Sequence, residues 1–368
     1  MTVAALGAAG IAAGAVLGGG AASGAPPVTP PGASAYLQPA VNGRGGFGAS
    51  GGDGYGAGHG RYGGGATTTG TTATSAQQVG VVDIVSTLGY QSAEAAGTGM
   101  VLTSNGDVLT NNHVVDGATS ISVTIVSSGV TYTATVVGTD PSADVAVLQL
   151  DGASGLATAG LGTSPATVGE AVTAVGNAGG TGTLSAAGGT VSAVNQSITA
   201  TDSNGSNAEQ LSGLIQTDAR IQPGDSGGPL YASTGAIVGM DTAASSGGAV
   251  QAYAIPISTA ERIATEIEQG VTSATIHQGY PAFLGVSVSD GQGGVSVLGV
   301  VSDGPAASAG MTAGDVITAV GGRALTSAAD LSAALAGHSP GQQVAVSWAD
   351  AGGGVHSATV TLGTGPAQ

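Results

Sequence analysis

A serine in a glycine-rich turn is the residue whose surroundings point most directly to chemistry. Ser226 lies in the segment Gly224-Asp225-Ser226-Gly227-Gly228-Pro229-Leu230. Glycines let a backbone turn sharply and bring its N–H groups together without Cβ atoms in the way. A serine hydroxyl is a weak nucleophile at neutral pH, so it needs a base within hydrogen-bond reach and a third group that orients the base. The turn therefore predicts a nucleophilic serine with partners elsewhere in the chain.

Two upstream residues are the predicted partners of Ser226. His113 is the only histidine in the predicted catalytic region, residues 77–272, and Asp144 stands directly before the apolar run 145–150. We expect Ser226 to attack the scissile carbonyl, His113 to take and return the proton, and Asp144 to orient the imidazole. The chain order His, Asp, Ser is that of the chymotrypsin-type triad, and it differs from the orders in subtilisins and α/β-hydrolases.

Charge and composition argue against several other kinds of function. The chain of 368 residues has 22 acidic side chains, five arginines and no lysine, with a formal net charge of -17. This balance repels phosphate backbones, so no nucleic-acid partner is expected. The absence of cysteine excludes disulfides, thiol catalysis and cysteine-based metal sites. The remaining histidines are isolated in the sequence, so no metal and no other cofactor is expected.

The first 76 residues differ in composition from the rest. Residues 3–22 are apolar, mostly alanine and glycine, and no charged side chain precedes Arg44. We predict that residues 1–25 are an export signal or a membrane anchor, and retention as an anchor is slightly favoured over cleavage. Residues 26–76 are rich in Gly, Ala, Pro and Thr with few large apolar side chains, which predicts a disordered linker.

From Gln77 onward the chain reads as a series of short strands. Runs rich in Val and Thr alternate with glycine-containing turns, and Asn105-Gly106 between two such runs predicts a tight hairpin. Further strands are expected over 121–126, 132–137, 145–150, 171–175, 189–194, 236–240 and 252–257. Many short strands at this spacing predict a pair of all-β barrels over residues 77–272. A helix over 259–269 is expected to close this region.

A second, smaller unit is predicted over residues 279–365. Its pattern is two strands, a short helix at 305–309, a strand at 316–320, a helix at 327–336 and two closing strands. Ser327 is the expected N-cap of the second helix, with Asp330 three residues further on. This alternation predicts a small α+β domain.

Several segments together resemble the HtrA/DegP-like trypsin-type serine proteases, and the second unit resembles their PDZ domain. The segments that carry this resemblance are Gly97-Thr98-Gly99-Met100, Leu109-Thr110-Asn111-Asn112-His113, Ala174-Val175-Gly176-Asn177, Gly189-Thr190-Val191-Ser192-Ala193, Ile215-Gln216-Thr217-Asp218-Ala219, Gly224–Leu230 and Tyr253-Ala254-Ile255-Pro256. The arrangement is most similar to the secreted PepA-like proteases of mycobacteria and related actinobacteria. The similarity covers Gln77 to the C-terminus and leaves out the first 75 residues.

The resemblance implies a fold and assigns further site residues. It implies a chymotrypsin-like double six-stranded β-barrel followed by a small α+β PDZ domain. The backbone N–H groups of Gly224 and Ser226 would form the oxyanion hole, with the N–H of Asp225 converging nearby. Asp225 stands where HtrA proteins usually carry Asn. Since this residue contributes mainly its backbone, little effect on the chemistry is expected.

Arg220 is the candidate S1 residue under the same resemblance. It lies six residues before Ser226, where trypsin-like enzymes place the base of the S1 pocket. If its side chain points into the pocket, Arg220 favours an acidic P1 residue. In the favoured alternative, Arg220 turns away and pairs with a nearby carboxylate such as Asp218.

The resemblance also assigns a peptide-binding loop in the PDZ-like unit. Phe283-Leu284-Gly285-Val286 would capture the carboxylate of a peptide C-terminus, and the peptide would add as a strand to the sheet edge. Leu331 and Leu335 would line the pocket for the last apolar side chain of the peptide. The alternative is that both leucines belong to the core alone.

These observations lead to one expected function and one alternative. We expect an exported serine endopeptidase, anchored or secreted in the cell envelope or outside the cell, that cleaves unfolded or damaged proteins. Its PDZ domain would bind C-terminal peptides, and only its N-terminal segment would contact a membrane. The alternative is a latent protease that acts mainly as a peptide-binding or chaperone-like module. HtrA-type proteins often form trimers, so a homo-oligomer is a further expectation.

Overall fold

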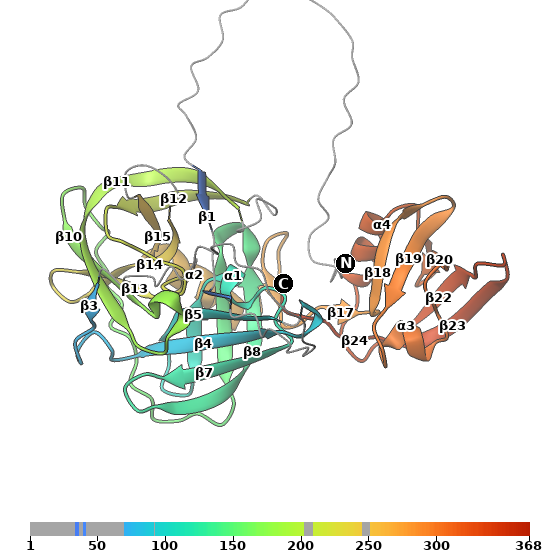
Figure 1. Cartoon of the computed structure of the whole chain (residues 1–368), viewed down its shortest axis with the longest axis horizontal. Helices are drawn as coiled ribbons and strands as arrows, with labels where there is room; N and C mark the ends of the chain where they lie inside the picture. Colours follow the sequence, from blue (N-terminus) through green and yellow to red (C-terminus); the bar gives the residue numbers. More distant parts are fainter. Residues whose placement is uncertain (1–33, 37–39, 42–69, 92, 202–208, 245–250) are drawn as a thin grey trace, which may run out of the picture.

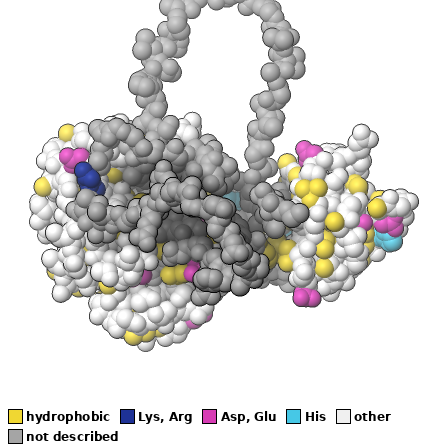
Figure 2. Space-filling view, in the orientation of Figure 1, with side chains coloured by type: hydrophobic (Ala, Val, Ile, Leu, Met, Phe, Trp, Pro, Cys, Tyr) yellow, Lys and Arg dark blue, Asp and Glu magenta, His cyan; other side chains and the backbone are white. Residues whose placement is uncertain are grey.

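The computed structural model describes residues 34–36, 40–41, 70–91, 93–201, 209–244 and 251–368. The predicted signal or anchor over 1–25 and most of the predicted linker lie outside these ranges. Among the described residues, no helix combines the length and apolar character needed to cross a membrane. Figure 1 shows two adjoining β-barrels with a smaller domain beside them. On the face seen in Figure 2, acidic side chains are scattered and basic ones are sparse.

Six strands close the first barrel in the order β8-β7-β4-β5-β6-β9, and β9 pairs back with β8. They are β4 (Val81–Leu88), β5 (Ala93–Val101), β6 (Asp107–Thr110), β7 (Ser120–Ile125), β8 (Val130–Asp140) and β9 (Val145–Leu150). The predicted hairpin joins β5 and β6, and Gly106 adopts the positive φ of 100° that its turn requires. The first half of the predicted barrel pair is confirmed.

The second barrel also has six strands, in the order β11-β10-β13-β14-β15-β12, and β12 pairs back with β11. They are β10 (Ala171–Gly176), β11 (Ser185–Thr201), β12 (Glu209–Thr217), β13 (Pro229–Ala232), β14 (Ile237–Ala244) and β15 (Ala252–Pro256). Strands β12 and β13 were absent from the predicted strands because Ser212 and Gly213 interrupt the first and Pro229 begins the second. The double six-stranded barrel is confirmed.

Helix α2 (Ile257–Glu268) holds the two barrels together. Its buried residues follow helical spacing and are Ile257, Ala260, Ile263, Ala264 and Ile267. They pack into one core with residues of both barrels, including Val147 on β9 and Met240 on β14. The predicted helix over 259–269 is thus confirmed, and its apolar face fixes the junction at which the catalytic residues meet.

Three short strands lie within the segment expected to be disordered. β1 (Ser34–Tyr36) pairs with β11 and β14, β2 (Ala40–Val41) pairs with β5, and β3 (Thr71–Thr72) pairs with β11. The structure has strands at these three places, where the sequence predicted a disordered linker over 26–76. Pairing with a strand edge uses backbone groups and needs no large apolar side chain, so composition did not reveal it.

The C-terminal unit is an α+β domain with its own core. Its main sheet runs in the order β18-β19-β20-β22-β23, with β21 beside β20, and β17 pairs with β24 in a separate ribbon. The strands are β17 (Ala282–Phe283), β18 (Val286–Gly291), β19 (Gly294–Val300), β20 (Val316–Val320), β21 (Arg323–Ala324), β22 (Gln343–Ala349), β23 (Val355–Thr361) and β24 (Gly363–Thr364). The helices are α3 (Pro305–Ser308) and α4 (Ala328–Leu335). Ser327 caps α4 as predicted, because its side chain accepts from the N–H of Asp330 at 3.2 Å.

The C-terminal unit contacts the first barrel through Phe283 and Ala367. The ring of Phe283 on β17 stacks on Tyr90 of η1 (Gly89–Gln91), with ring centroids 5.5 Å apart. Beyond β24, Ala367 is buried against the first barrel; its N–H donates to the carbonyl of Ala118, and its carbonyl accepts from Gly117. The chain beyond the small domain is therefore fastened to the segment that follows α1 (Asn112–Val115).

Asp83 on β4 makes the stability of the first barrel depend on pH. It is 7% exposed, its Oδ1 has no hydrogen-bond partner among the described residues, and burial raises its pKa to about 6. Between about pH 4 and pH 6 the folded chain keeps a proton that the unfolded chain has released. Asp83 therefore makes the free energy of unfolding fall as the pH rises through this window.

We expect Asp83→Asn to raise the free energy of unfolding near pH 7.5 by about 3 kcal/mol, since the variant has no buried charge to form there. Near pH 4 the two proteins should differ little. Urea unfolding at both pH values measures the difference. A variant less stable than the wild type near pH 7.5 would contradict the prediction.

Candidate active site

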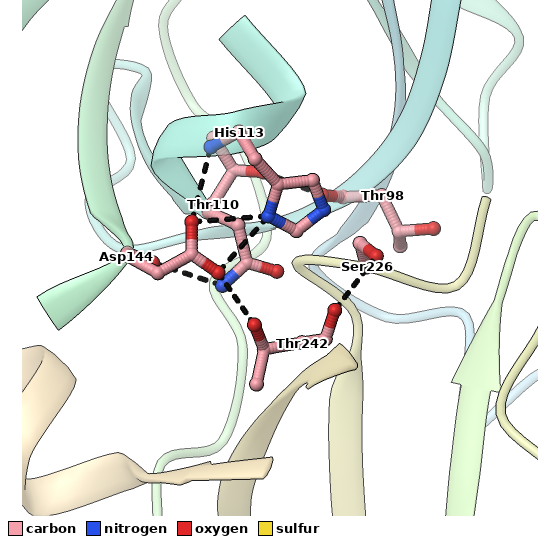
Figure 3. A network of polar contacts seen from close by, with 7 residues as sticks. Thr98, Thr110, His113, Asp144, Ser226 and Thr242 are labelled. Atoms are coloured by element: carbon pink, nitrogen blue, oxygen red, sulfur yellow. Dashed lines mark hydrogen bonds and ion pairs between the residues drawn. The ribbon is translucent and has the colours of Figure 1, made fainter. Parts of the chain in front are cut away.

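The predicted catalytic residues meet where the two barrels adjoin (Figure 3). His113 lies on α1, which follows β6, and Asp144 lies between the short helix η2 (Pro141–Ala143) and β9. Ser226 lies in the turn that leads into β13. The first barrel thus supplies the histidine and the aspartate, and the second barrel supplies the serine.

Asp144 holds the imidazole of His113 on two oxygens. The Nδ1 atom of His113 lies 3.0 Å from both Oδ1 and Oδ2 of Asp144, and the backbone N–H of His113 donates to Oδ1 at 3.0 Å. Asp144 is fully buried, and the His113 side chain is 9% exposed. A carboxylate at this place favours the tautomer with the proton on Nδ1, which leaves the lone pair of Nε2 for the nucleophile.

The carboxylate of Asp144 is itself fixed by its surroundings. Its backbone is left-handed, with φ 55° and ψ 48°, a conformation that costs a residue with a Cβ roughly 1–2 kcal/mol. The Asn111 amide donates to the carbonyl of Asp144 at 2.9 Å, and the Thr242 hydroxyl donates to Oδ2 at 2.5 Å. This unusual backbone conformation turns the carboxylate toward the imidazole.

Ser226 does not yet contact the base. Its Oγ donates to the carbonyl of Thr242 at 3.2 Å, and Nε2 of His113 is buried with no hydrogen-bond partner among the described residues. The hydroxyl lies beside the imidazole in Figure 3. Rotation of the serine side chain from the Thr242 carbonyl toward Nε2 would create the bond between nucleophile and base.

The turn around Ser226 presents two free backbone donors. Gly224 has φ 99°, and a Cβ at this position would collide with the carbonyl of Asn177. The N–H groups of Gly224 and Ser226 donate to no described residue. The N–H of Asp225 is instead used inside the turn, where it donates to the carbonyl of Gln222 at 2.9 Å. The expected convergence of Asp225 on the oxyanion hole is therefore wrong.

Thr98 on β5 supports this turn from the opposite barrel. Its N–H donates to the carbonyl of Ser226 at 2.8 Å, and its hydroxyl donates to the carbonyl of Gly224 at 2.7 Å. The same hydroxyl accepts from the N–H of Asn177 at 2.9 Å. Thr98 is fully buried, so these bonds are shielded from water.

The sequence did not single out Thr98, Thr242 or Asn111 as functional residues. Thr98 and Asn111 lie in two of the segments that resemble the HtrA/DegP-like proteases. This resemblance was the one feature of the sequence that could have indicated a functional role for them. Their roles depend on contacts between positions such as 98 and 224, or 144 and 242, that are far apart in the chain. A local pattern of residue types cannot predict contacts between residues that are so far apart in the chain.

Arg220 is exposed, between the buried residues Ala219 and Ile221. It forms no ion pair with any residue in the described ranges. The alternative in which Arg220 pairs with Asp218 is not seen among the described residues, where Asp218 accepts from the N–H of Thr190 at 2.6 Å. A role of Arg220 in the S1 pocket stays a prediction.

In the C-terminal unit, the predicted carboxylate-binding loop has two free donors. The carbonyls of Leu284 and Gly285 accept from the N–H groups of Ala306 and Val301, each at 2.9 Å. The N–H groups of Leu284 and Gly285 donate to no described residue. Gly285 has φ 81°, which suits a loop that aims consecutive N–H groups outward.

The two leucines predicted to line the peptide groove are core residues. Leu331 is fully buried and Leu335 is 5% exposed, and both pack in the core of the small domain. Helix α4, which carries them, contacts the edge strand β18. The structure thus supports the core alternative for both side chains, and their contact with a peptide stays a prediction.

Within the described part of the chain, no three or more residues of His, Cys, Asp and Glu are grouped so that they could hold a metal ion.

We expect Thr98→Val to lower kcat/KM on a peptide substrate by about tenfold or more, since the loss of one oxyanion donor in comparable enzymes costs about 100-fold or more. The Gly224 carbonyl and the Asn177 N–H would each lose a partner, so stability should fall by about 1–3 kcal/mol. Thr98→Ser keeps the hydroxyl and is the matched control. Wild-type kcat/KM in the valine variant would contradict the proposed support of the turn.

Comparison with known proteins finds a match for each of the two units of the chain. Residues 97–240 match the family described as trypsin-like peptidase domain, and residues 282–352 match the PDZ domain family. Together the two matches span more than half of the chain.

Three relatives show how far the similarity extends. The serine protease PepD of Mycobacterium tuberculosis is 36% identical over 306 residues, which cover 77% of this chain and 63% of PepD. The periplasmic pH-dependent serine endoprotease DegQ of Escherichia coli is 35% identical over 268 residues, which cover 69% of this chain and 56% of DegQ. A solved structure of the HtrA-type protease AlgW with a decapeptide aligns with 80% of this chain and 99% of its own, at 27% identity and a TM-score of 0.45.

The chain spans between 56% and 63% of the length of the two curated relatives. The two domain matches and the identity to both relatives place it in one group. The chain carries a trypsin-like peptidase domain and a PDZ domain, and it is homologous to mycobacterial PepD and to the HtrA/DegP proteases.

Proposed function

We propose that this protein is an exported serine endopeptidase that cleaves unfolded or damaged proteins through an acyl-enzyme. The observation that carries the proposal is the arrangement of the imidazole: Nδ1 of His113 is held 3.0 Å from both oxygens of Asp144, and Nε2 is free beside Ser226. A histidine with a structural role would have its second nitrogen hydrogen-bonded, because a buried polar atom without a partner is costly.

In the proposed reaction, Nε2 of His113 takes the proton of Ser226 as Oγ attacks the scissile carbonyl carbon. The carbonyl π electrons move to the oxygen, and the N–H groups of Gly224 and Ser226 donate to this oxyanion. His113 then gives its proton to the leaving amine as the C–N bond breaks. Water, activated by the same nitrogen, hydrolyses the ester, and Asp144 stabilises the imidazolium in both steps.

The PDZ domain is proposed to bind the C-terminus of a peptide. The free N–H groups of Leu284 and Gly285 are donors for a carboxylate, and β18 is an edge strand to which a peptide can add. Phe283, directly before this loop, stacks on Tyr90 of the protease domain. A bound peptide would therefore act on a residue that contacts the first barrel, which gives a route from peptide binding to proteolysis.

Export is proposed from the apolar segment 3–22 and from the periplasmic location in the name of DegQ. Retention as a membrane anchor or release after cleavage are both consistent with this segment, and a trimeric assembly stays a prediction.

A second candidate function rests on the absence of a hydrogen bond between Ser226 and His113 in this structure. In this alternative, the protease is latent and the protein acts mainly as a peptide-binding or chaperone-like module.

The first test is cleavage of unfolded casein by the full chain and by Ser226→Ala. We expect cleavage by the wild type alone, with a loss of activity of about a millionfold in the variant. Binding of C-terminal peptides should be unchanged in Ser226→Ala, because the two sites are in separate domains. Cleavage by both proteins would exclude the serine mechanism. The absence of cleavage by either, even with C-terminal peptides added, would favour the binding-module alternative.

The second test concerns the carboxylate-binding loop. At φ 81° a Cβ on Gly285 is strained, and it would lie 3.4 Å from both the Phe283 ring and Pro305. We expect Gly285→Ala to weaken the binding of a fluorescent peptide with a free C-terminus by about tenfold, which corresponds to about 1.4 kcal/mol.

Gly299→Ala is the matched control, since Gly299 lies in the same domain and a Cβ there meets open space. Its affinity for the peptide should equal that of the wild type. If the wild type binds an amidated peptide as tightly as the free acid, the loop does not recognise a carboxylate and the assignment fails.

A further inference from the structure

Two buried carboxyl groups lie behind the turn that presents Ser226. Asp225 is 2% exposed, and Asp241 on β14 is fully buried. The backbone joins their segments: the N–H of Gly227 donates to the carbonyl of Asp241, and the N–H of Asp241 donates to the carbonyl of Gly228, each at 2.8 Å. The N–H of Gly228 donates back to the carbonyl of Asp225 at 2.9 Å. A movement of either aspartate therefore acts on the backbone that holds the nucleophile.

These carboxyl groups have almost no hydrogen-bond partners. Asp225 accepts from the N–H of Gln222 through Oδ2 at 2.8 Å. Its Oδ1, and both carboxyl oxygens of Asp241, have no partner among the described residues. The Oδ1 of Asp225 faces Gly176 on β10, where a Cβ would come within 2.7 Å of it. Asp225 is thus packed closely against β10.

No cation compensates the pair within the described ranges. Among the described side chains, the titratable or charged ones on the segments packed around it are Tyr231 on β13, Tyr253 on β15, Glu94 on β5, and Asp218 and Arg220 before the turn; β10 carries none. Arg220 is exposed, whereas both carboxyl groups are buried. Thr242, next to Asp241, directs its hydroxyl to Asp144 and so serves the triad instead.

Two carboxylates cannot both be ionised at low cost in such a place. Removing a charge from water without a partner costs several kcal/mol or more, and two like charges raise this cost further. Burial raises the pKa of Asp225 to about 7, and burial together with the charge of Asp225 raises the pKa of Asp241 well above its usual value. Near neutral pH the pair therefore keeps a proton, which belongs to the two groups jointly.

We propose that Asp225 and Asp241 are positioning residues that share one proton, and that this proton holds the nucleophile turn in its catalytic shape. With one proton present, only one of the two buried carboxyl groups carries a charge. When the proton leaves to solvent, both groups are anionic and repel each other. Asp225 moves, and the neighbouring oxyanion donors of Gly224 and Ser226 move with it.

This inference rests on the proposed peptidase activity and adds an upper pH limit to it. A general base must be unprotonated to act, which gives the pH profile of kcat/KM its acidic limb. The shared proton sets the alkaline limb. A catalytic triad alone gives no reason for the site to need a proton on Asp225 or Asp241.

The kinetic test compares the wild type with Asp241→Asn on an uncharged peptide substrate. The amide of asparagine donates a hydrogen bond at every pH and carries no charge. We expect the wild-type kcat/KM to fall by about tenfold or more on the alkaline side, the effect of a misplaced oxyanion donor. In Asp241→Asn this alkaline fall of kcat/KM should be absent. On the acidic side, kcat/KM of the variant should fall at the same pH as that of the wild type. If Asp241→Asn does not fold, Asp225→Asn removes the second charge in the same way.

Asp83→Asn is the matched control for the removal of a buried carboxyl group. Asp83 lies on β4, and burial raises its pKa to about 6, yet within the described ranges it makes no hydrogen bond to the nucleophile turn. We expect this variant to keep the alkaline limb of the wild type. An alkaline limb lost in both variants would assign it to general stability and overturn the proposal.

A second measurement needs no proteolysis, so that failure of this inference is distinguishable from failure of the proposed function. The infrared difference spectrum between the wild type and Asp241→Asn at neutral pH should contain the C=O band of a protonated carboxylic acid. Absence of this band overturns the proposal even if the enzyme is active. The proposal is also overturned if kcat/KM of Asp241→Asn still falls on the alkaline side as in the wild type. A changed preference for the substrate residue at the scissile bond, with the limb intact, would place Asp241 in the substrate pocket instead.

Discussion

The hydrogen bonds between Thr98 and the nucleophile turn are the interaction on which the rest of this site depends. Ser226 comes from the second barrel, and the base comes from the first, so their distance is set by whatever fixes one barrel against the other. Thr98 does this at the site itself, because its N–H and hydroxyl donate to the carbonyls of Ser226 and Gly224. Helix α2 fixes the same junction from behind, through a core shared by both barrels. The turn is thus held by the opposite barrel, which also carries His113.

Thr242 makes the second connection between the barrels. Its hydroxyl donates to Asp144, and its carbonyl accepts from Ser226, so one residue contacts both ends of the triad. In the state described here, the serine hydroxyl rests on this carbonyl while Nε2 of His113 has no partner. Under the proposed mechanism, the step to the reactive arrangement is a rotation of the Ser226 side chain from the Thr242 carbonyl toward Nε2.

The sequence predicted the parts of this molecule that depend on local patterns. Both barrels, helix α2, the Ser327 cap and the PDZ-type unit follow from strand-and-turn spacing, helical periodicity and family resemblance. The use of the Asp225 N–H inside the turn, the strands β1 to β3 and the supporting role of Thr98 were not predicted. Each of these depends on which backbone group lies opposite another across the fold. Residue type does not report this, because every residue except proline offers the same N–H and C=O.

The scarcity of cations explains how the buried acids of this site are satisfied. With five arginines and no lysine in the whole chain, an internal carboxylate can seldom be paired with a positive side chain. Asp144 receives hydrogen bonds from the His113 N–H and the Thr242 hydroxyl, which suit an ionised group. Asp225 receives one such bond, from the Gln222 N–H, and the carboxyl group of Asp241 receives none from the described residues. A proton is the remaining way to reduce their charge. The same composition therefore leads to an orienting carboxylate on one side of Ser226 and to a proton-sharing pair on the other, and the difference between them comes from the number of donors that the fold directs at each carboxyl group.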